Sequence, residues 1–171
     1  MLVVFLGNPG PEYKFTRHNS GFFVAENMTI LQDLRWNQKF FGMFAKKDFS
    51  GHPHYFLKPE TFMNLSGKSV QAAKSFFKLI EREIVVVHDD IETEFGVVTF
   101  REGGGFAGHN GLKSIANSIG NPNFLRIKIG VGRPKKGDVA SFVLGKFTPE
   151  EMAFLPVMAG AAEEKLKELL R

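Results

Sequence analysis

Short apolar runs alternate with longer amphipathic segments along the chain, and this alternation is the strongest constraint on its fold. Residues 2–6, LVVFL, and residues 84–88, IVVVH, are typical of buried strands. The predicted order is strand, helix, two strands, helix, two strands, helix, strand and helix. We therefore predict an α/β fold, a single domain over residues 1–171 with a twisted, mostly parallel or mixed β-sheet flanked by helices.

Turn and capping residues set the predicted boundaries. A hairpin is expected around Ser50-Gly51-His52-Pro53, and Ser66 is a candidate helix cap. Thr148 and Glu151 form the pattern of a capping box, which predicts the start of the last helix. The predicted strands are 2–6, 42–49, 54–58, 84–88, 97–101 and 125–132, and the predicted helices are 20–34, 66–79, about 110–120 and about 148–171.

Length and composition exclude several classes of protein. A chain of 171 residues with 43% hydrophobic content can bury a core, which argues against disorder. It has no apolar stretch of about 18 residues, so we expect no membrane-spanning helix, and the apolar start is too short for a signal peptide. The absence of cysteine excludes disulfides and a thiol nucleophile. We expect a cytoplasmic protein.

The charge is unevenly distributed. Residues 150–171 contain five glutamates and three basic residues, a net charge of −2. Because the whole chain carries +4, residues 1–149 carry +6. A basic body favours a polyanionic partner such as nucleic acid, although ordinary solubility would also explain it.

Polar stretches follow the predicted strands or open the predicted helices. Because strand ends in an α/β fold meet at one edge of the sheet, we expect Asn8, His18 and Asp89 to approach one another there, with Asn64 and Asn110 near them. The stretches are GNPG (7–10) with TRHN (16–19), TFMNLSG (61–67), HDD (88–90) and GGGFAGHNG (103–111).

A hydrolase built on these residues would use water as its nucleophile, because the chain has neither a G-x-S-x-G motif nor a cysteine. His18 is the natural base, since imidazole titrates near neutral pH, and Asp89 would orient it. The amides of Asn8, Asn64 and Asn110 suit a peptide-like or ribose-like substrate, and an amide can stabilise an oxyanion.

These residues also have purely structural interpretations. His18 could be an ordinary loop histidine, the asparagines could be turn or capping residues, and Phe62 and Met63 could belong to the core or a pocket wall. The HDD stretch could be a turn or a metal site. The metal interpretation is weak because no second histidine has ligand spacing and HExxH is absent.

Residues 103–108 match G-x-G-x-x-G between a predicted strand and helix. A Rossmann site is disfavoured because the motif lies late in the chain and Leu125–Lys128 stands where an acidic residue should bind ribose. The glycines could instead let the backbone approach a phosphate or an RNA end.

Taken together, the motifs resemble those of bacterial-type peptidyl-tRNA hydrolase. They occur in the order of that family, cover nearly the whole chain to about residue 147, and are highly specific as a set. The matching segments are FLGNPGPEY (5–13), TRHNSGF (16–22), KPETFMNLSG (58–67), VVHDDIETEFG (86–96), GGGFAGHNGLKSI (103–115), FLRIKIGVGRP (124–134) and FVLGKF (142–147).

The resemblance implies hydrolysis of the ester between a peptide, or an N-blocked amino acid, and the 3′ ribose of tRNA, in a cytoplasmic monomer that needs no metal or cofactor. By motif, His18 is the expected base and Asp89 its partner. Arg101 and Lys128 would bind the tRNA 5′ phosphate. The implied substrate-binding residues are Asn8, Tyr13, Phe62, Met63, Asn64, His109 and Asn110.

Three features depart from the family pattern. Lys128 replaces an expected arginine, so this contact is a point charge rather than a bidentate fork. Ala107 replaces a frequent glycine, which would stiffen the loop. The family usually carries a longer C-terminal helical region, and this bears on how the acceptor stem is gripped and how the cleft is covered.

Two other functions remain as alternatives. One is a non-catalytic RNA-binding relative, like the plant group II intron splicing factors that share the fold. The intact set of His, Asp and Asn residues favours an enzyme over this alternative. The other is a nucleotide-binding domain that uses residues 103–108, which predicts saturable binding of a dinucleotide.

Overall fold

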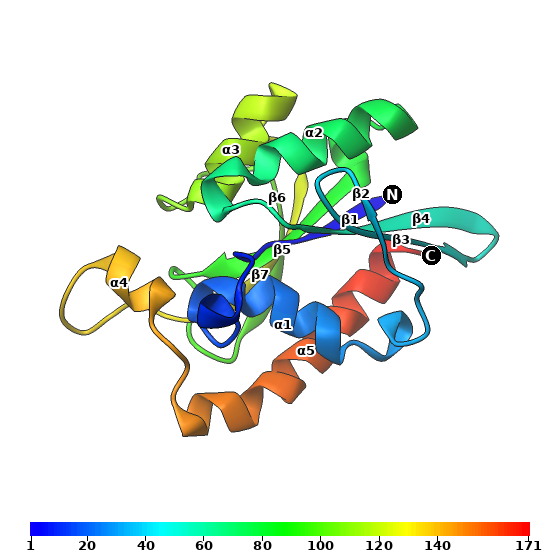
Figure 1. Ribbon diagram of the computed structural model, residues 1–171. Helices are drawn as coiled ribbons and strands as arrows, with labels where there is room; N and C mark the ends of the chain where they lie inside the picture. The colour runs from blue at the N-terminus through cyan, green and yellow to red at the C-terminus, as the bar shows by residue number, and fades with distance from the viewer.

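A seven-stranded mixed sheet forms the centre of the computed structural model, which describes residues 1–171 (Figure 1). The inner strands pair in parallel, whereas the strand pairs at the two edges of the sheet are antiparallel. In spatial order the strands are β2 (Asn37–Lys39), β3 (Gly42–Phe49), β4 (His52–Pro59), β1 (Leu2–Phe5), β5 (Ile84–Asp90), β7 (Leu125–Gly130) and β6 (Val98–Glu102).

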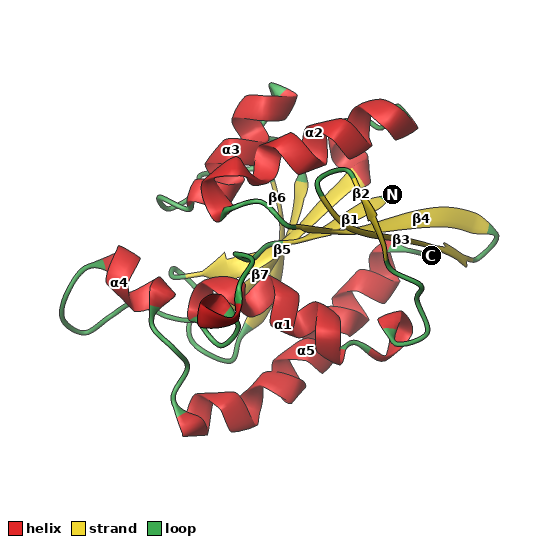
Figure 2. Cartoon of the chain, viewed as in Figure 1, coloured by secondary structure: helices red, strands yellow, loops and turns green.

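Helices cover both faces of the sheet, as Figure 2 shows. The helices α2 (Ser66–Phe77) and α3 (Asn110–Ile119) lie on one face, and α1 (Ser20–Asn27) and α5 (Pro149–Leu169) lie on the other. Each face buries its own apolar cluster, because alternate residues of β1 and β5 point to opposite sides. Gly67 permits the close approach of α2 to α3, since a Cβ there would lie 2.1 Å from the carbonyl oxygen of Ser114.

The predicted fold class is confirmed, with local differences. The helix predicted over 20–34 is wrong in length, because α1 ends at Asn27 and only a 3₁₀ turn, η3 (Thr29–Leu31), follows. A tertiary contact explains the break: the backbone and hydroxyl of Thr29 donate hydrogen bonds to Glu163 on α5. The short strand β2 and the helix α4 (Val139–Leu144) were not predicted.

The predicted capping residues differ in outcome. Thr148 and Glu151 form the expected capping box of α5. Ser66 is not a cap but the first residue of α2, and its hydroxyl donates to the carbonyl of Met63. Helix α3 begins at Asn110 as expected, and its cap is the ring of His109. No helix is long and apolar enough to cross a membrane.

The strand order places the polar loops at one edge of the sheet. The parallel strands β4, β1, β5 and β7 all end at that edge, so the segments that follow them converge there. Two short 3₁₀ helices, η2 (Arg17–Asn19) and η4 (Met63–Leu65), bring further side chains to the same place.

Candidate active site

A cavity of about 610 Å³ opens at this edge of the sheet. Besides the predicted residues, its walls include Phe106 to Gly108 of the glycine loop and several residues of α4. The structure thereby gathers side chains from five separate segments into one pocket. All the predicted catalytic and substrate-binding residues line it: Asn8, Tyr13, His18, Phe62, Met63, Asn64, Asp89, His109 and Asn110.

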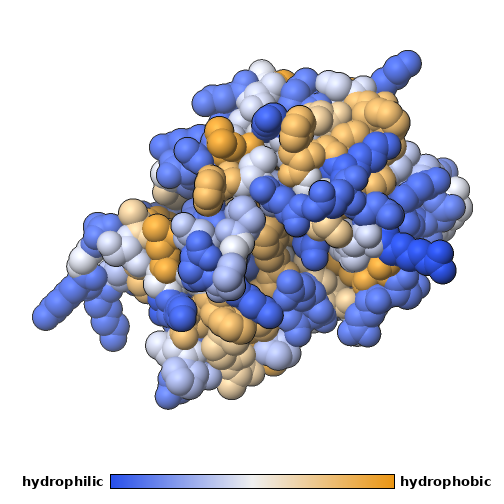
Figure 3. Space-filling view, in the orientation of Figure 1, coloured by the Kyte–Doolittle hydropathy of each residue, from blue (hydrophilic) through white to orange (hydrophobic).

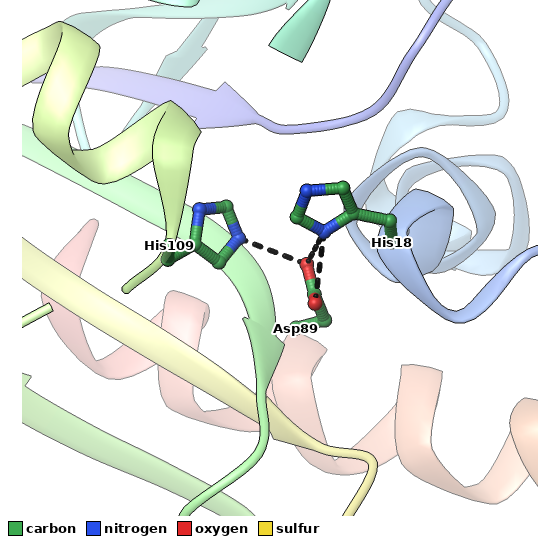
Figure 4. Close-up of side chains that lie close together, drawn as sticks. All are labelled: His18, Asp89 and His109. Atoms are coloured by element: carbon green, nitrogen blue, oxygen red, sulfur yellow. Dashed lines mark hydrogen bonds and ion pairs between the residues drawn. The ribbon is translucent and has the colours of Figure 1, made fainter. Parts of the chain in front are cut away.

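His18 and Asp89 meet within this pocket. Asp89 lies at the carboxyl end of β5, and His18 is presented by η2, whose Ser20 hydroxyl bonds back to the carbonyl of Arg17. The Nδ1 atom of His18 lies 2.9 Å from Oδ1 and 3.0 Å from Oδ2 of Asp89 (Figure 4). Because a carboxylate only accepts, Nδ1 carries the proton, and the lone pair of neutral His18 lies on Nε2.

The electrostatics of the pair favour a charged aspartate. Burial opposes ionisation of Asp89, but the neighbouring His18 and His109 rings outweigh it and hold the pKa of that carboxyl well below its usual range. Burial likewise disfavours a charged His18, yet the charge and hydrogen bond of Asp89 prevail and raise the pKa of His18. His18 is therefore a stronger base than a free imidazole.

His109 is the second ring that binds Asp89. Its Nε2 lies 2.9 Å from Asp89 Oδ1, while its Nδ1 accepts from the backbone N–H groups of Gly111 and Leu112 at the start of α3. These bonds place a proton on Nε2, which donates to Asp89, and leave Nδ1 as the acceptor. The sequence motif placed His109 among substrate-binding residues, but it gave no sign that the ring joins a helix cap to Asp89.

The same three side chains are the group that could bind a metal ion. Ligand atoms of His18, Asp89 and His109 lie within 4.8 Å of one another. His109 thus supplies the second histidine that sequence spacing did not reveal. In the structure these atoms are hydrogen-bonded to one another, since both rings donate to Asp89.

Asn8 connects the loops that surround the pocket. Its Oδ1 accepts a 2.7 Å bond from the backbone N–H of Met63, which fixes η4 against the end of β1. Asn19 bonds both the N–H and the carbonyl of Asn8, each at 2.9 Å. The Asn8 Nδ2 group forms no hydrogen bond within the chain and is available to a substrate. Sequence reasoning missed Asn19, although it belongs to the quoted TRHN stretch.

The two predicted phosphate-binding residues lie outside the pocket, on the α2/α3 face of β6 and β7. Arg101 pairs in register with Arg126, and Lys128 with Thr99, so the two cations are diagonal neighbours. Lys128 Nζ lies 3.0 Å from Asp90 Oδ2. The guanidinium of Arg101 occupies the space where a Cβ of Gly104 would lie.

Arg126 is a cation that sequence reasoning missed. It is 2% exposed, and its guanidinium donates to the carbonyls of Gly103 and Gly105. It therefore joins the sheet to the glycine loop, whose positive φ angles at Gly103, Gly104, Ala107 and Gly108 turn the chain toward the pocket.

Comparison with known proteins agrees with this geometry. The family model described as peptidyl-tRNA hydrolase matches residues 2–171. The chain belongs to the peptidyl-tRNA hydrolase family.

Relatives and solved structures give the same result. The peptidyl-tRNA hydrolase of Geotalea daltonii is 44% identical over 171 residues, which is 99% of this chain and 90% of that protein. The Geotalea uraniireducens protein is 45% identical over 170 residues, 99% and 89% of the two chains. The crystal structure of the Acinetobacter baumannii enzyme superposes with a TM-score of 0.91 at 37% identity, and covers 99% of this chain and 87% of that one.

Within this peptidyl-tRNA hydrolase fold, α4 is the part of the site that sequence reasoning did not find. Asp138 caps it by accepting from the backbone N–H of Ser141. Its residues Val139, Val143 and Leu144 line the pocket. An Asp one residue before an apolar run was the available signal, but the segment is short and follows a lysine-rich loop.

Proposed function

We propose that this chain hydrolyses the ester between the peptide and the 3′ ribose of peptidyl-tRNA, with His18 as the general base. Family membership supports the reaction. The observation that carries the mechanism is the His18–Asp89 pair in the pocket, with Nδ1 committed to the carboxylate and Nε2 unpaired. Hydrolysis releases free tRNA and a peptide acid, which recycles tRNA from prematurely released peptidyl-tRNA.

The reaction proceeds through activated water. His18 Nε2 removes a proton from water as its oxygen attacks the ester carbonyl carbon, and Asp89 stabilises the imidazolium that forms. When the tetrahedral intermediate collapses, the bond between that carbon and the ribose oxygen breaks. The imidazolium then returns its proton to the departing ribose oxygen, so the enzyme ends in its starting state.

Neutral amides bind the substrate around the base. Asn64 and Asn110 are exposed at the pocket, and the free Nδ2 of Asn8 faces it as well. The Asn64 amide stabilises the oxyanion, and the others bind the peptide group next to the ester. A free α-amino group is cationic, and a site built of neutral amides disfavours it. The enzyme therefore spares ordinary aminoacyl-tRNA.

The tRNA lies on the β6–β7 side of the base. Arg101 and Lys128 bind its 5′ phosphate, in agreement with the basic charge of residues 1–149. Lys128 would share its ammonium between Asp90 and the phosphate. We propose that the enzyme acts as a monomer in the cytoplasm, where translation supplies its substrate, and light scattering at working concentration tests the oligomeric state.

The decisive experiment measures release of N-acetyl-aminoacyl groups from tRNA by the purified chain in the presence of EDTA. We expect release by the wild type that resists EDTA and falls about 10²–10⁴-fold in His18→Ala. His52→Ala is the matched control, because that histidine is exposed in the β3–β4 hairpin and should retain full activity.

Other outcomes would reject the proposal. Full activity in His18→Ala would remove the base assignment. Loss of activity with EDTA, restored by a divalent cation, would support metal chemistry at the His18, Asp89 and His109 cluster. Tight tRNA binding without any release by the wild type would support the non-catalytic RNA-binding alternative.

A further inference from the structure

The turn between β2 and β3 contains two phenylalanines in an unfavourable backbone conformation. Lys39 pairs with Gly42, so Phe40 and Phe41 form a two-residue hairpin loop. Their φ angles are 56° and 57°. Such turns are normally occupied by Asn and Gly, because a side chain at positive φ crowds the backbone. A strained position that persists in an otherwise regular hairpin needs a compensating role.

Packing explains Phe40 but not Phe41. The Phe40 ring lies 5.2–5.6 Å from the rings of Phe44, Phe76 and Phe77, and its carbonyl accepts from the Ser69 hydroxyl. Residue Phe41 is 54% exposed, and the only contact on the face of its ring is the ammonium of Lys68, 4.1 Å from the ring centroid. Asn or Gly at position 41 would relieve the strain without any loss of core packing.

Phe41 adjoins the chain segment that supplies part of the pocket wall. Its carbonyl accepts a hydrogen bond from Glu60, and its ring contacts Lys68, so the segment 60–68 flanks it on both sides. That segment contributes Phe62 to the pocket and leaves Phe62 and Leu65 56% and 53% exposed. We define Phe41, Phe62 and Leu65 as the outer apolar patch. Figure 3 shows hydrophobic residues gathered around α2 on this face of the molecule.

The strand order decides which part of the substrate can reach this patch. The active site lies at the ends of β1 and β5. The proposed phosphate contacts, Arg101 and Lys128, lie on the β6–β7 side, whereas the outer apolar patch adjoins β3 and β4 on the other side. The ester joins tRNA to peptide, so when the tRNA lies toward β6 and β7, the peptide extends toward β4 and β3.

We propose that the outer apolar patch is a subsite for apolar side chains of the peptide, beyond the residue attached to the ribose. This inference rests on the proposed function of the pocket and extends it to a substrate class: peptidyl-tRNA with several apolar residues. The charges beside the patch, Glu60 and Lys68, have opposite signs, and an uncharged peptide segment suits such surroundings better than a phosphate backbone does.

The test compares three substrates on the same tRNA: N-acetyl-alanyl, a hexapeptidyl with leucines in its N-terminal half, and a hexapeptidyl with serines there. We expect the wild type to hydrolyse the leucine substrate about tenfold more efficiently, in kcat/KM, than the serine substrate, as burial of a few apolar groups allows. Phe41→Asn should remove most of this preference.

The same variant distinguishes binding from a structural role. Asn favours the positive φ at position 41, so Phe41→Asn should raise Tm by roughly 2–4 °C while it loses the preference. Phe41→Gly provides a second variant with the same expectation. The control is Val157→Ser on α5, where an equally exposed apolar side chain lies on the opposite face of the sheet, and it should keep the preference.

Three results would overturn the inference. The first is an equal rate for the leucine and serine substrates in the wild type. The second is a lower Tm in Phe41→Asn with the preference intact, which would make Phe41 structural. The third is weaker binding of deacylated tRNA by Phe41→Asn, which would assign the patch to RNA bases. Failure of the proposed function itself is distinct, because the wild type would then release no N-acetyl-alanine.

Discussion

His18 Nδ1 lies 2.9 Å from Asp89 Oδ1, although the two residues are 71 positions apart in the sequence. This contact has two effects: it orients the imidazole, and it makes the ring a stronger base. The carboxylate fixes the proton on Nδ1, and its charge, held in a buried site, raises the pKa of the ring against the opposing effect of burial.

The pH dependence of hydrolysis should report this contact. A base acts when it is neutral, so kcat/KM should rise with pH through the raised pKa of His18, with a midpoint above the ordinary value of about 6.5. Asp89→Asn removes the charge, so the midpoint should shift to lower pH while the maximal rate falls about 10²–10⁴-fold. An unchanged midpoint in Asp89→Asn would show that another group governs the profile.

His109 should affect activity and stability through different atoms. His109→Ala removes the helix cap and should lower the free energy of unfolding by about 1 kcal/mol. His109→Asn restores a capping side chain that is too short to reach Asp89. We expect kcat/KM to fall about tenfold in both variants, because Asp89 loses one of its two hydrogen-bond partners. Only the alanine variant should have a lower Tm. Equal Tm values would contradict the capping role.

His88 should make the fold sensitive to acid. Burial, followed by the positive potential of His109, lowers the pKa of His88 to about 3, and its ring Nε2 has no hydrogen-bond partner. The unfolded chain takes up this proton near pH 6.5, whereas the folded chain does not. Stability is therefore lost as the pH falls below 6.5.

Denaturant titrations at pH 6.5 and 4.5 check this expectation, and comparison with His88→Asn removes the contribution of the carboxylates, which both proteins share. The wild type should lose about 2 kcal/mol more than His88→Asn between the two values. His18 has a raised pKa, so its contribution to the pH dependence has the opposite sign, and it cancels in the comparison because both proteins retain this residue. A parallel pH dependence in the two proteins would exclude His88 as the cause.

The two cations on β6 and β7 should act on the end of the tRNA. Arg101→Ala and Lys128→Ala should each weaken binding of tRNA. Each should also reduce the slope of log Kd against log salt concentration by about one, because one phosphate contact is lost. Removal of the 5′ phosphate from the tRNA should abolish the difference between each variant and the wild type. A penalty that persists with dephosphorylated tRNA would place the contact elsewhere on the acceptor stem.

Arg126 should determine the order of the glycine loop. Arg126→Met removes the charged donors from the carbonyls of Gly103 and Gly105, and should lower the free energy of unfolding by about 2–4 kcal/mol. Amide hydrogen exchange over residues 103–108 should become faster, and Arg126→Lys should give an intermediate effect because it keeps one donor group. Unchanged exchange in Arg126→Met would mean that the loop is fixed by other contacts.

The sequence by itself determined the α/β class, most strands and the polar residues of the pocket. Alternation of apolar runs is a local property, and Thr148 with Glu151 caps α5 through bonds within one turn. The polar stretches at the ends of 2–6 and 84–88 lie at one edge of the sheet because parallel strands share that edge. Their proximity was therefore expected from the predicted order, whereas the contact between His18 and Asp89 was not determined by it.

Only the tertiary structure decided the features that depend on contacts between distant segments. Glu163 on α5 ends the predicted helix 20–34 at Asn27 by binding Thr29. His109 reaches Asp89 because α3 packs against α2 and carries its first turn over the end of β5. The sequence pattern marks Arg126 as an ordinary strand residue, yet its side chain is buried beneath the glycine loop. Such bonds join atoms far apart in the chain, and no local pattern of residues encodes the distance between them.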